Sequence, residues 1–180
     1  MNSGKDFEAQ FKDSIPDSPD IFYYLRLKDS ANSFNKDQGC LRFTLHQPYD
    51  CQIYKFPNLN CFELKSKAST SLSIQTDKKE SGKDIKLNQI EGLLEADKCE
   101  GVSGGFIINF RLTNNTYWLW IKDFQKFRDN SPKKSINEKD VVGNNAIPIG
   151  QSLKRIKYVY DIEKLLKDIW DYKNRIKREG

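Results

Sequence analysis

The stretch from Asp50 to Lys67 reads DCQIYKFPNLNCFELKSK, and it is the part of the chain that best indicates the fold. Residues 50–56 and 60–67 are rich in strand-forming side chains and flank a Pro-Asn dipeptide, a combination typical of a β-hairpin. In a hairpin whose turn centres between residues 56 and 57, Asp50 lies opposite Glu63. We therefore predict two antiparallel strands that bring these two carboxylates together.

The triplet Glu63-Leu64-Lys65 places an acid and an amine side by side. Side chains alternate between the faces of a strand, so Glu63 and Lys65 share one face while Leu64 points to the other. Two carboxylates can hold a hard divalent cation, and a neighbouring lysine can orient or polarise water that attacks a phosphate. Asp50, Glu63 and Lys65 are therefore candidates for metal-dependent phosphodiester hydrolysis. A solvent-facing ion pair between Glu63 and Lys65 is the alternative interpretation.

Length and composition favour one folded domain. The chain has 180 residues, of which 37% are hydrophobic, including eleven Phe, eight Tyr and three Trp. We expect one domain over residues 1–180, with a core over about 4–128 and a basic C-terminal segment over about 129–180. No long apolar run or basic-then-apolar leader is present, so neither a membrane span nor a secretory signal is expected.

The cysteine pattern argues against a bound zinc ion or iron–sulfur cluster. The four cysteines form no CxxC pair, and His46 is the only histidine. The thiols are expected to be reduced, in a cytoplasmic protein.

The positive charge is concentrated near the C-terminus. From Gln151 onward, nine lysines and arginines stand against five acids, so this segment carries +4 of the total net charge of +5. Such a local excess is the electrostatic footprint of a polyanion binder. A solvated helix face would carry the same charges.

The rest of the sequence predicts helices and strands in a mixed order. Apolar periodicity predicts helices over residues 4–14, 84–96, 122–127 and 160–178, the last with a buried stripe of Ile162, Leu165, Leu166, Ile169 and Trp170. Strand-forming runs predict a mostly buried strand over 21–27, a short one over 41–45, and a hairpin over 106–110 and 117–121 with Trp118 and Trp120 in the core. Polar segments predict loops over 28–39, 68–83 and 129–150, the second of them mobile. This order predicts a mixed α/β fold, a central mixed β-sheet flanked by helices.

Eight short motifs, spread from Gly4 to Tyr158, form a recognisable series. They are Gly4-Lys5-Asp6-Phe7-Glu8, Pro48-Tyr49-Asp50, Phe62-Glu63-Leu64-Lys65, Thr70-Ser71-Leu72, Lys86-Leu87-Asn88-Gln89-Ile90, Lys133-Lys134-Ser135-Ile136, Ile147-Pro148-Ile149-Gly150 and Arg155-Ile156-Lys157-Tyr158. In this order they resemble the RecU Holliday-junction resolvases of bacteria and their phages, which belong to the PD-(D/E)XK nuclease superfamily. The resemblance implies a restriction-endonuclease-like core, Mg²⁺ as cofactor (with Mn²⁺ able to substitute), a homodimer, and four-way DNA junctions as substrate.

The resemblance also implies a role for each motif residue of the active site. Asp50 and Glu63 would be metal ligands, with the backbone carbonyl of Leu64 as a third. Lys65 would orient the attacking water or stabilise charge on the phosphate. Glu8 would approach the metal site from the first helix, and Gln89 would hydrogen-bond the phosphate or the water.

A second group of motif residues would hold the DNA backbone. Lys133, Lys134, Arg155 and Lys157 are expected to contact phosphates, an interaction that is independent of sequence and sensitive to salt.

The chain departs from the family pattern in two places. The family has a long stalk before the catalytic Asp, whereas only residues 28–49 are available here, which leaves junction selectivity open. The family's two histidines before the helix Gln are replaced by Lys86 and Asn88. A restriction-type or general duplex endonuclease, and a non-cleaving DNA-binding accessory protein, therefore remain the alternatives to a junction resolvase.

Overall fold

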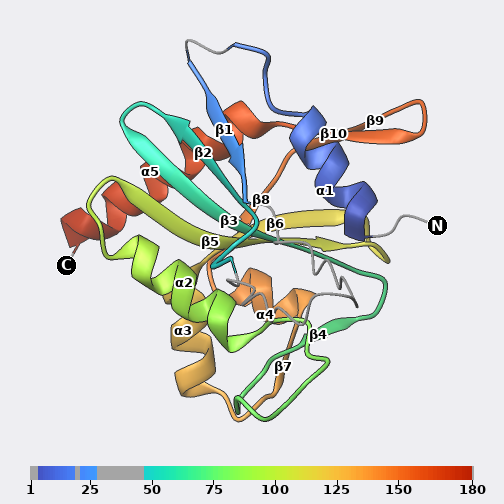
Figure 1. Cartoon of the computed structure of the whole chain (residues 1–180), viewed down its shortest axis with the longest axis vertical. Helices are drawn as coiled ribbons and strands as arrows, with labels where there is room; N and C mark the ends of the chain where they lie inside the picture. The colour runs from blue at the N-terminus through green and yellow to red at the C-terminus, as the bar shows by residue number, and fades with distance from the viewer. Residues whose placement is uncertain (1–3, 19–20, 28–46, 180) are drawn as a thin grey trace, which may run out of the picture.

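A computed structural model describes residues 4–18, 21–27 and 47–179 of the chain. The elements are, in chain order, α1 (Gly4–Asp13), β1 (Tyr23–Arg26), β2 (Cys51–Lys55), β3 (Asn58–Lys67), β4 (Ser71–Ser73), α2 (Leu87–Asp97), β5 (Val102–Phe110), β6 (Asn115–Trp120), α3 (Ile121–Asn130), β7 (Ser135–Asn137), α4 (Glu138–Gly143), β8 (Ile147–Pro148), β9 (Gln151–Lys154), β10 (Lys157–Tyr160) and α5 (Ile162–Glu179). A six-stranded sheet in the order β1-β2-β3-β5-β6-β8 forms the centre of the molecule (Figure 1). The predicted mixed sheet flanked by helices is confirmed.

The hairpin of β2 and β3 has the register that the sequence predicts. Cys51 pairs with Phe62 and Lys55 with Asn58, so the turn is formed by Phe56 and Pro57. Continuing this register by one residue places Asp50 opposite Glu63.

The sheet is mixed because β3 and β5 run parallel. Glu63 pairs with Phe106, and the connection between the two strands contains α2. A parallel pair requires such a crossover. Gly104 on β5 allows α2 to approach closely, because a Cβ atom at this position would lie 2.5 Å from the backbone oxygen of Leu93.

Helices cover both faces of the sheet. On the Glu63 face, α2 packs against β3 and β5, and Phe124 of α3 lies 4.9 Å from Phe106 between ring centroids. On the opposite face, Phe11 of α1 packs edge-on against Phe62. Tyr172 of α5 packs against Trp118 on that same face. In Figure 1, α2 and α3 lie below the strands and α1 lies above them.

The two tryptophans of β6 are in the core, as predicted. Trp118 is fully buried and Trp120 is 5% exposed.

Three expectations about the individual elements are wrong. β1 is not mostly buried, because it is the edge strand of the sheet and its neighbour β2 covers only one side. The segment over 68–83 contains β4, and the segment over 129–150 contains β7, α4 and β8. These strands have two or three residues each, too few to show a hydrophobic period. Trp170 is not part of the buried stripe of α5, since it is 37% exposed and Tyr172 is buried in its place.

The loop over 28–39, the strand over 41–45 and most of the stalk region lie outside the described residues. Among the helices of the described segments, none combines the length and the apolar character that crossing a membrane requires.

Candidate active site

Asp50 is held at the point where β2 begins. Its backbone nitrogen donates a hydrogen bond to the carbonyl of Phe62 at 3.0 Å. Its side-chain Oδ2 accepts a hydrogen bond from the backbone nitrogen of Leu64 at 2.7 Å. The carboxylate of Asp50 therefore accepts the hydrogen bond that a backbone carbonyl would accept if the pairing of β2 with β3 continued. This fixes Asp50 beside the Glu63-Leu64-Lys65 triplet.

The segment that leads into Asp50 packs against α2. A Cβ atom at Gly92 would lie 2.5 Å from the side chain of Pro48, so the absence of a side chain at Gly92 allows this contact. The start of β2 and the helix that carries Gln89 are thus neighbours.

Glu63 is a buried acid in the middle of the sheet. It is 3% exposed and lies between β2 and β5. Burial raises the pKa of Glu63 to about 7, the positive charge of Lys65 opposes this rise, and the negative charge of Asp50 adds to it. Lys65 Nζ lies 2.9 Å from Glu63 Oε1.

Gln89 reaches the same oxygen from α2. Its Nε2 donates a hydrogen bond to Glu63 Oε1, and its Oε1 accepts one from the backbone nitrogen of Lys86 at 3.0 Å. The side-chain amide thus links the first turn of α2 to the acid on β3. This is the arrangement expected of a residue that positions Glu63.

The start of α2 is anchored to the sheet by Asp84. This carboxylate accepts hydrogen bonds from the backbone nitrogen of Ser73 at 2.9 Å and from Lys67 Nζ at 2.5 Å. These hydrogen bonds and the ion pair with Lys67 hold the pKa of Asp84 below its ordinary value, against the effect of partial burial. Lys67 lies on the same face of β3 as Glu63 and Lys65, so one strand face carries both the site and the anchor of its helix.

Glu8 joins the group from α1. Burial raises the pKa of Glu8, the charge of Asp50 adds to the rise, and the ion pair with Arg26 opposes it. Glu8 also raises the pKa of Glu63 through its charge. The three acids therefore interact electrostatically across one site.

Arg26 is a member of the site that the sequence did not reveal. It pairs with Cys51 on β2, next to Asp50, and its guanidinium binds Glu8. Only the register of β1 on β2 brings it there, and no motif in the sequence specifies that register.

The chemistry of two of these acids suits a hard divalent cation. Asp50 and Glu63 offer carboxylate oxygens, which Mg²⁺ prefers. Burial is the main cause of the raised pKa values of Glu8 and Glu63, and the charge of Asp50 adds a smaller rise, which a bound cation would offset. In the described part of the chain no three His, Cys, Asp or Glu residues are grouped so that they could hold a metal. Asp50 and Glu63, with the Leu64 carbonyl as a third ligand, stay a prediction from the sequence.

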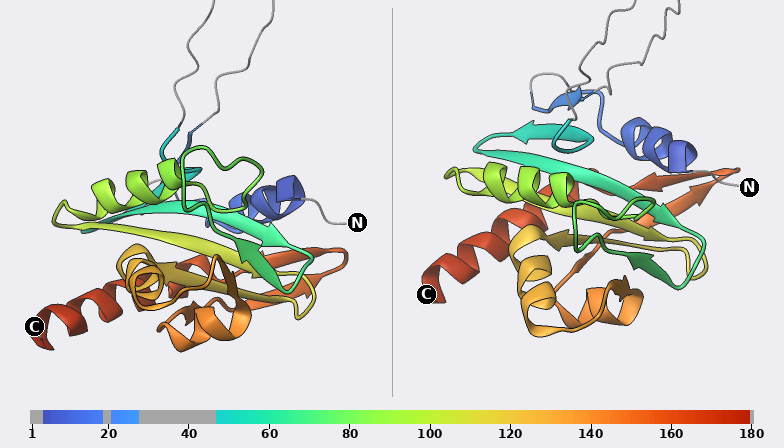
Figure 2. Two further views of the ribbon diagram at one scale, coloured as in Figure 1. Left: turned by 90° about the horizontal axis from the view of Figure 1, so that it is seen from below. Right: turned by 60° about the horizontal axis from the view of Figure 1, so that its bottom comes forward.

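The four residues predicted to bind DNA phosphates lie in two separate places. Lys133 and Lys134 precede β7, where Lys133 forms an ion pair with Asp140 at 2.6 Å. Arg155 lies in the turn between β9 and β10, and Lys157 begins β10. Figure 2 shows this hairpin extending past the end of the sheet beside α1.

Comparisons with known proteins give a sequence relative and a structural neighbour. No protein-family model matches the chain. It is 32% identical over 176 residues to the SPbeta prophage-derived uncharacterized protein YotM of Bacillus subtilis (strain 168), with 91% of this chain and 85% of that protein covered. Among solved structures, it is similar to the Holliday junction resolvase Hjc of Archaeoglobus fulgidus, with a TM-score of 0.44, 10% identity, and coverage of 71% of this chain and 82% of that one.

Proposed function

The chain belongs to the family of the SPbeta prophage-derived protein YotM, and we propose that it is a magnesium-dependent endodeoxyribonuclease of the PD-(D/E)XK superfamily that cleaves four-way junctions or other branched DNA. The observation that carries the proposal is the convergence of Asp50, Glu63, Lys65, Gln89 and Glu8. These residues come from three separate parts of the chain, and each belongs to a motif that the sequence singles out. If Glu63 and Lys65 formed only a solvent-facing ion pair, Glu63 would be exposed. Glu63 is instead buried and accepts a hydrogen bond from Gln89.

The chemistry of the site follows from its charges. Asp50, Glu63 and the carbonyl of Leu64 would hold Mg²⁺, which when bound stabilises negative charge on the scissile phosphate. Hydrolysis would proceed by in-line attack of water on phosphorus, with cleavage of the bond to the 3′ oxygen, to leave a 5′-phosphate and a 3′-hydroxyl.

Lys65 is the residue of the chain that would act on the phosphate or the water directly. Its side chain is 15% exposed, and its ammonium group lies beside the carboxylate of Glu63. A fixed cation at this position stabilises the charge that develops on the phosphate oxygens, and it needs no reorganisation during the reaction. Gln89 would act through Glu63, by holding that carboxylate in place.

A homodimer fits the proposed substrate. A four-way junction has approximate two-fold symmetry and its resolution requires two cuts, so two equivalent active sites match it. This part of the proposal rests on the substrate and on the resemblance to the RecU family.

A second candidate is an endonuclease that cuts duplex DNA. The limited length of residues 28–49, where the RecU family has its stalk, favours it. The chemistry at Asp50 and Glu63 would be the same, and only the substrate would differ.

The test compares cleavage of a four-way junction with cleavage of a linear duplex of the same sequence, in Mg²⁺, in EDTA and with Ca²⁺ in place of Mg²⁺. We expect Mg²⁺-dependent cleavage that favours the junction, with binding but no cleavage in Ca²⁺. Equal cleavage of both substrates would support the duplex endonuclease. Binding without cleavage in Mg²⁺ would identify a DNA-binding accessory protein and overturn the proposal.

A further inference from the structure

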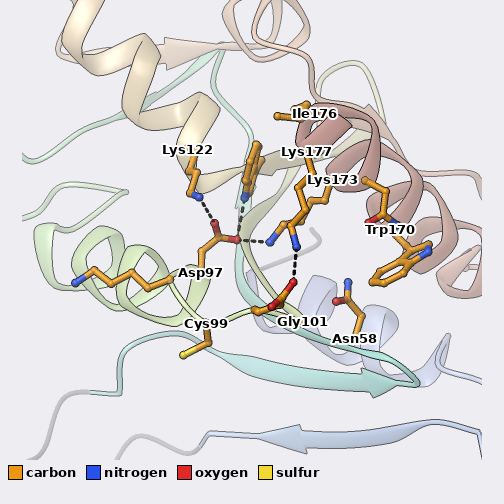
Figure 3. Close-up of a pocket in the computed structure, with 13 residues that line it drawn as sticks. Asn58, Asp97, Cys99, Gly101, Lys122, Trp170, Lys173, Ile176 and Lys177 are labelled. Carbon is orange, nitrogen blue, oxygen red and sulfur yellow. Dashed lines mark hydrogen bonds and ion pairs between the residues drawn. The ribbon is translucent and has the colours of Figure 1, made fainter. Parts of the chain in front are cut away.

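A hollow of about 290 Å³ lies between the C-terminal end of α2 and α5 (Figure 3). It is distinct from the carboxylate site, which is contacted by the other end of α2. Gln89 and Asp97 are eight residues apart on this helix, a distance of about 12 Å along its axis.

The base of the hollow is a buried carboxylate. The side chain of Asp97 is fully buried, and its Oδ1 accepts hydrogen bonds from the backbone nitrogen of Gly104 at 3.0 Å, from Trp120 Nε1 at 2.9 Å and from Lys173 Nζ at 2.8 Å. Lys173 is thereby neutralised by Asp97 and fixed in place. Burial lowers the pKa of Lys173, and the ion pair with Asp97 opposes this effect.

Two further lysines point toward the same hollow but are only loosely paired. Lys122 Nζ lies 3.5 Å from Asp97 Oδ2, with half of its side chain exposed. Lys177 Nζ lies 3.2 Å from Glu100, whose own side chain is 91% exposed. The Lys177–Glu100 pair is exposed on both sides, and such pairs are weak, so Lys177 can turn to an incoming anion. Lys122 stays near the buried Asp97, and its exposed half faces the hollow. Figure 3 shows Lys122 and Lys177 approaching the hollow from different elements.

Trp170 provides an aromatic surface at the edge of this hollow. It lines the hollow together with Lys177 and is 37% exposed, whereas Trp118 and Trp120 are buried. It also lines two other depressions along α5, one with Lys167 and the other with Arg175 and Arg178. An exposed indole within a row of cations is the combination that binds single-stranded nucleic acid, by base stacking and by phosphate contacts.

We propose that this hollow binds one nucleotide of a single-stranded DNA segment, with its base stacked on Trp170 and the flanking phosphates on Lys122 and Lys177. Duplex DNA does not fit this role, because its bases are already stacked on one another and cannot reach the indole. The proposal goes beyond DNA cleavage and does not depend on it, since binding is measured without hydrolysis.

The test uses the fluorescence of Trp170 in the full chain, in EDTA. Trp118 is fully buried, and Trp120, which also lines the hollow, is 5% exposed, so quenching that is lost in Trp170→Phe is assigned to Trp170. The probe is an oligodeoxythymidine of about ten nucleotides, a length typical of single-strand sites. A duplex of the same length and thymidine monophosphate are titrated in parallel.

We expect saturable quenching by the oligonucleotide only. Binding is measured by the fluorescence polarisation of a labelled oligonucleotide. Trp170→Ala should weaken binding about tenfold, while Trp170→Phe should retain most of the affinity because a phenyl ring also stacks. The double variant Lys122→Ala/Lys177→Ala should reduce the slope of log K against log salt by about 1.4, or about 0.7 for each phosphate contact. Lys139→Ala, which removes an exposed lysine on α4, is the matched control and should bind as the wild type does.

Three results would overturn the proposal: wild-type affinity in Trp170→Ala, equal quenching by the duplex, or equal affinity for the monophosphate, which would identify a site for free nucleotides. None of them would affect the cleavage assay at Asp50, so failure of this proposal is distinguishable from failure of the proposed function.

Discussion

Oδ2 of Asp50 accepts the hydrogen bond of the Leu64 backbone N–H at 2.7 Å, so a catalytic candidate also completes the ladder between β2 and β3. The same contact that holds the carboxylate beside Glu63 satisfies a partly buried backbone donor. Asp50 therefore has two separable roles, one in folding and one in chemistry.

This dual role predicts different effects for two substitutions of Asp50. Asp50→Asn keeps an oxygen that can accept from Leu64, so its free energy of unfolding in urea should stay close to that of the wild type. Asp50→Ala leaves the N–H without this partner and should lower the free energy of unfolding by about 1–2 kcal/mol. Equal stability of the two variants would show that the hydrogen bond does not matter for folding.

The position of Lys65 predicts a loss of rate together with a shift in pH dependence. Lys65→Met should reduce the cleavage rate by a factor of about 10²–10³, since it removes a fixed charge next to the phosphate. Because the charge of Lys65 lowers the pKa of Glu63, the acid limb of the pH–rate profile should move to higher pH. Lys79→Met, at an exposed lysine between β4 and α2, is the control and should retain the wild-type profile.

Burial of Glu63 predicts that the metal-free protein is less stable at higher pH. The pKa of Glu63 is about 7 in the folded state and 4.5 in its ordinary state, so the folded protein retains a proton that the unfolded chain releases. The free energy of unfolding in EDTA should therefore fall by about 3 kcal/mol as the pH rises through the window between these two values.

Urea denaturation at pH 5 and pH 8 measures most of this fall, since part of it has already occurred at pH 5. Glu63→Gln cannot ionise and should show a much smaller difference between the two pH values. Mg²⁺ should raise the free energy of unfolding of the wild type at pH 8, because the cation offsets the negative charge of the ionised Glu63. The same pH dependence in both proteins would contradict the assignment of the titration to Glu63.

The ion pair between Lys133 and Asp140 predicts that the two lysines before β7 contribute unequally to DNA binding. Lys134→Ala should reduce the slope of log K against log salt by about 0.9, the value for one contact with duplex phosphate. Lys133→Ala should have a smaller effect, because the carboxylate of Asp140 already neutralises Lys133. Polarisation of labelled DNA over a range of salt concentrations, in Ca²⁺, distinguishes the two. A larger loss in Lys133→Ala would contradict this ranking.

The sequence predicts the central hairpin and most of the candidate site for a simple physical reason. A hairpin register follows from the position of its turn, and strand alternation then fixes which side chains share a face with Glu63. The resemblance implies that Gln89 hydrogen-bonds the phosphate or the water, whereas its contact with Glu63 is not predicted and is seen only in the structure.

The features that the sequence does not predict depend on long-range pairing. β1 is rich in strand formers, but its exposure depends on its place at the edge of the sheet. β4 and β7 have three residues each and pair with one another across a long sequence separation. Arg26 enters the site through the register of β1 on β2, which no local pattern specifies.

The role of Asp50 in the chemistry is tested most directly by incubating wild-type protein and Asp50→Asn with an end-labelled four-way junction in Mg²⁺. We expect Mg²⁺-dependent strand cleavage by the wild type and none by Asp50→Asn, which should still bind the junction. Undiminished cleavage by Asp50→Asn would contradict the proposed role of Asp50, because hydrolysis would then not need its carboxylate as a metal ligand beside Glu63.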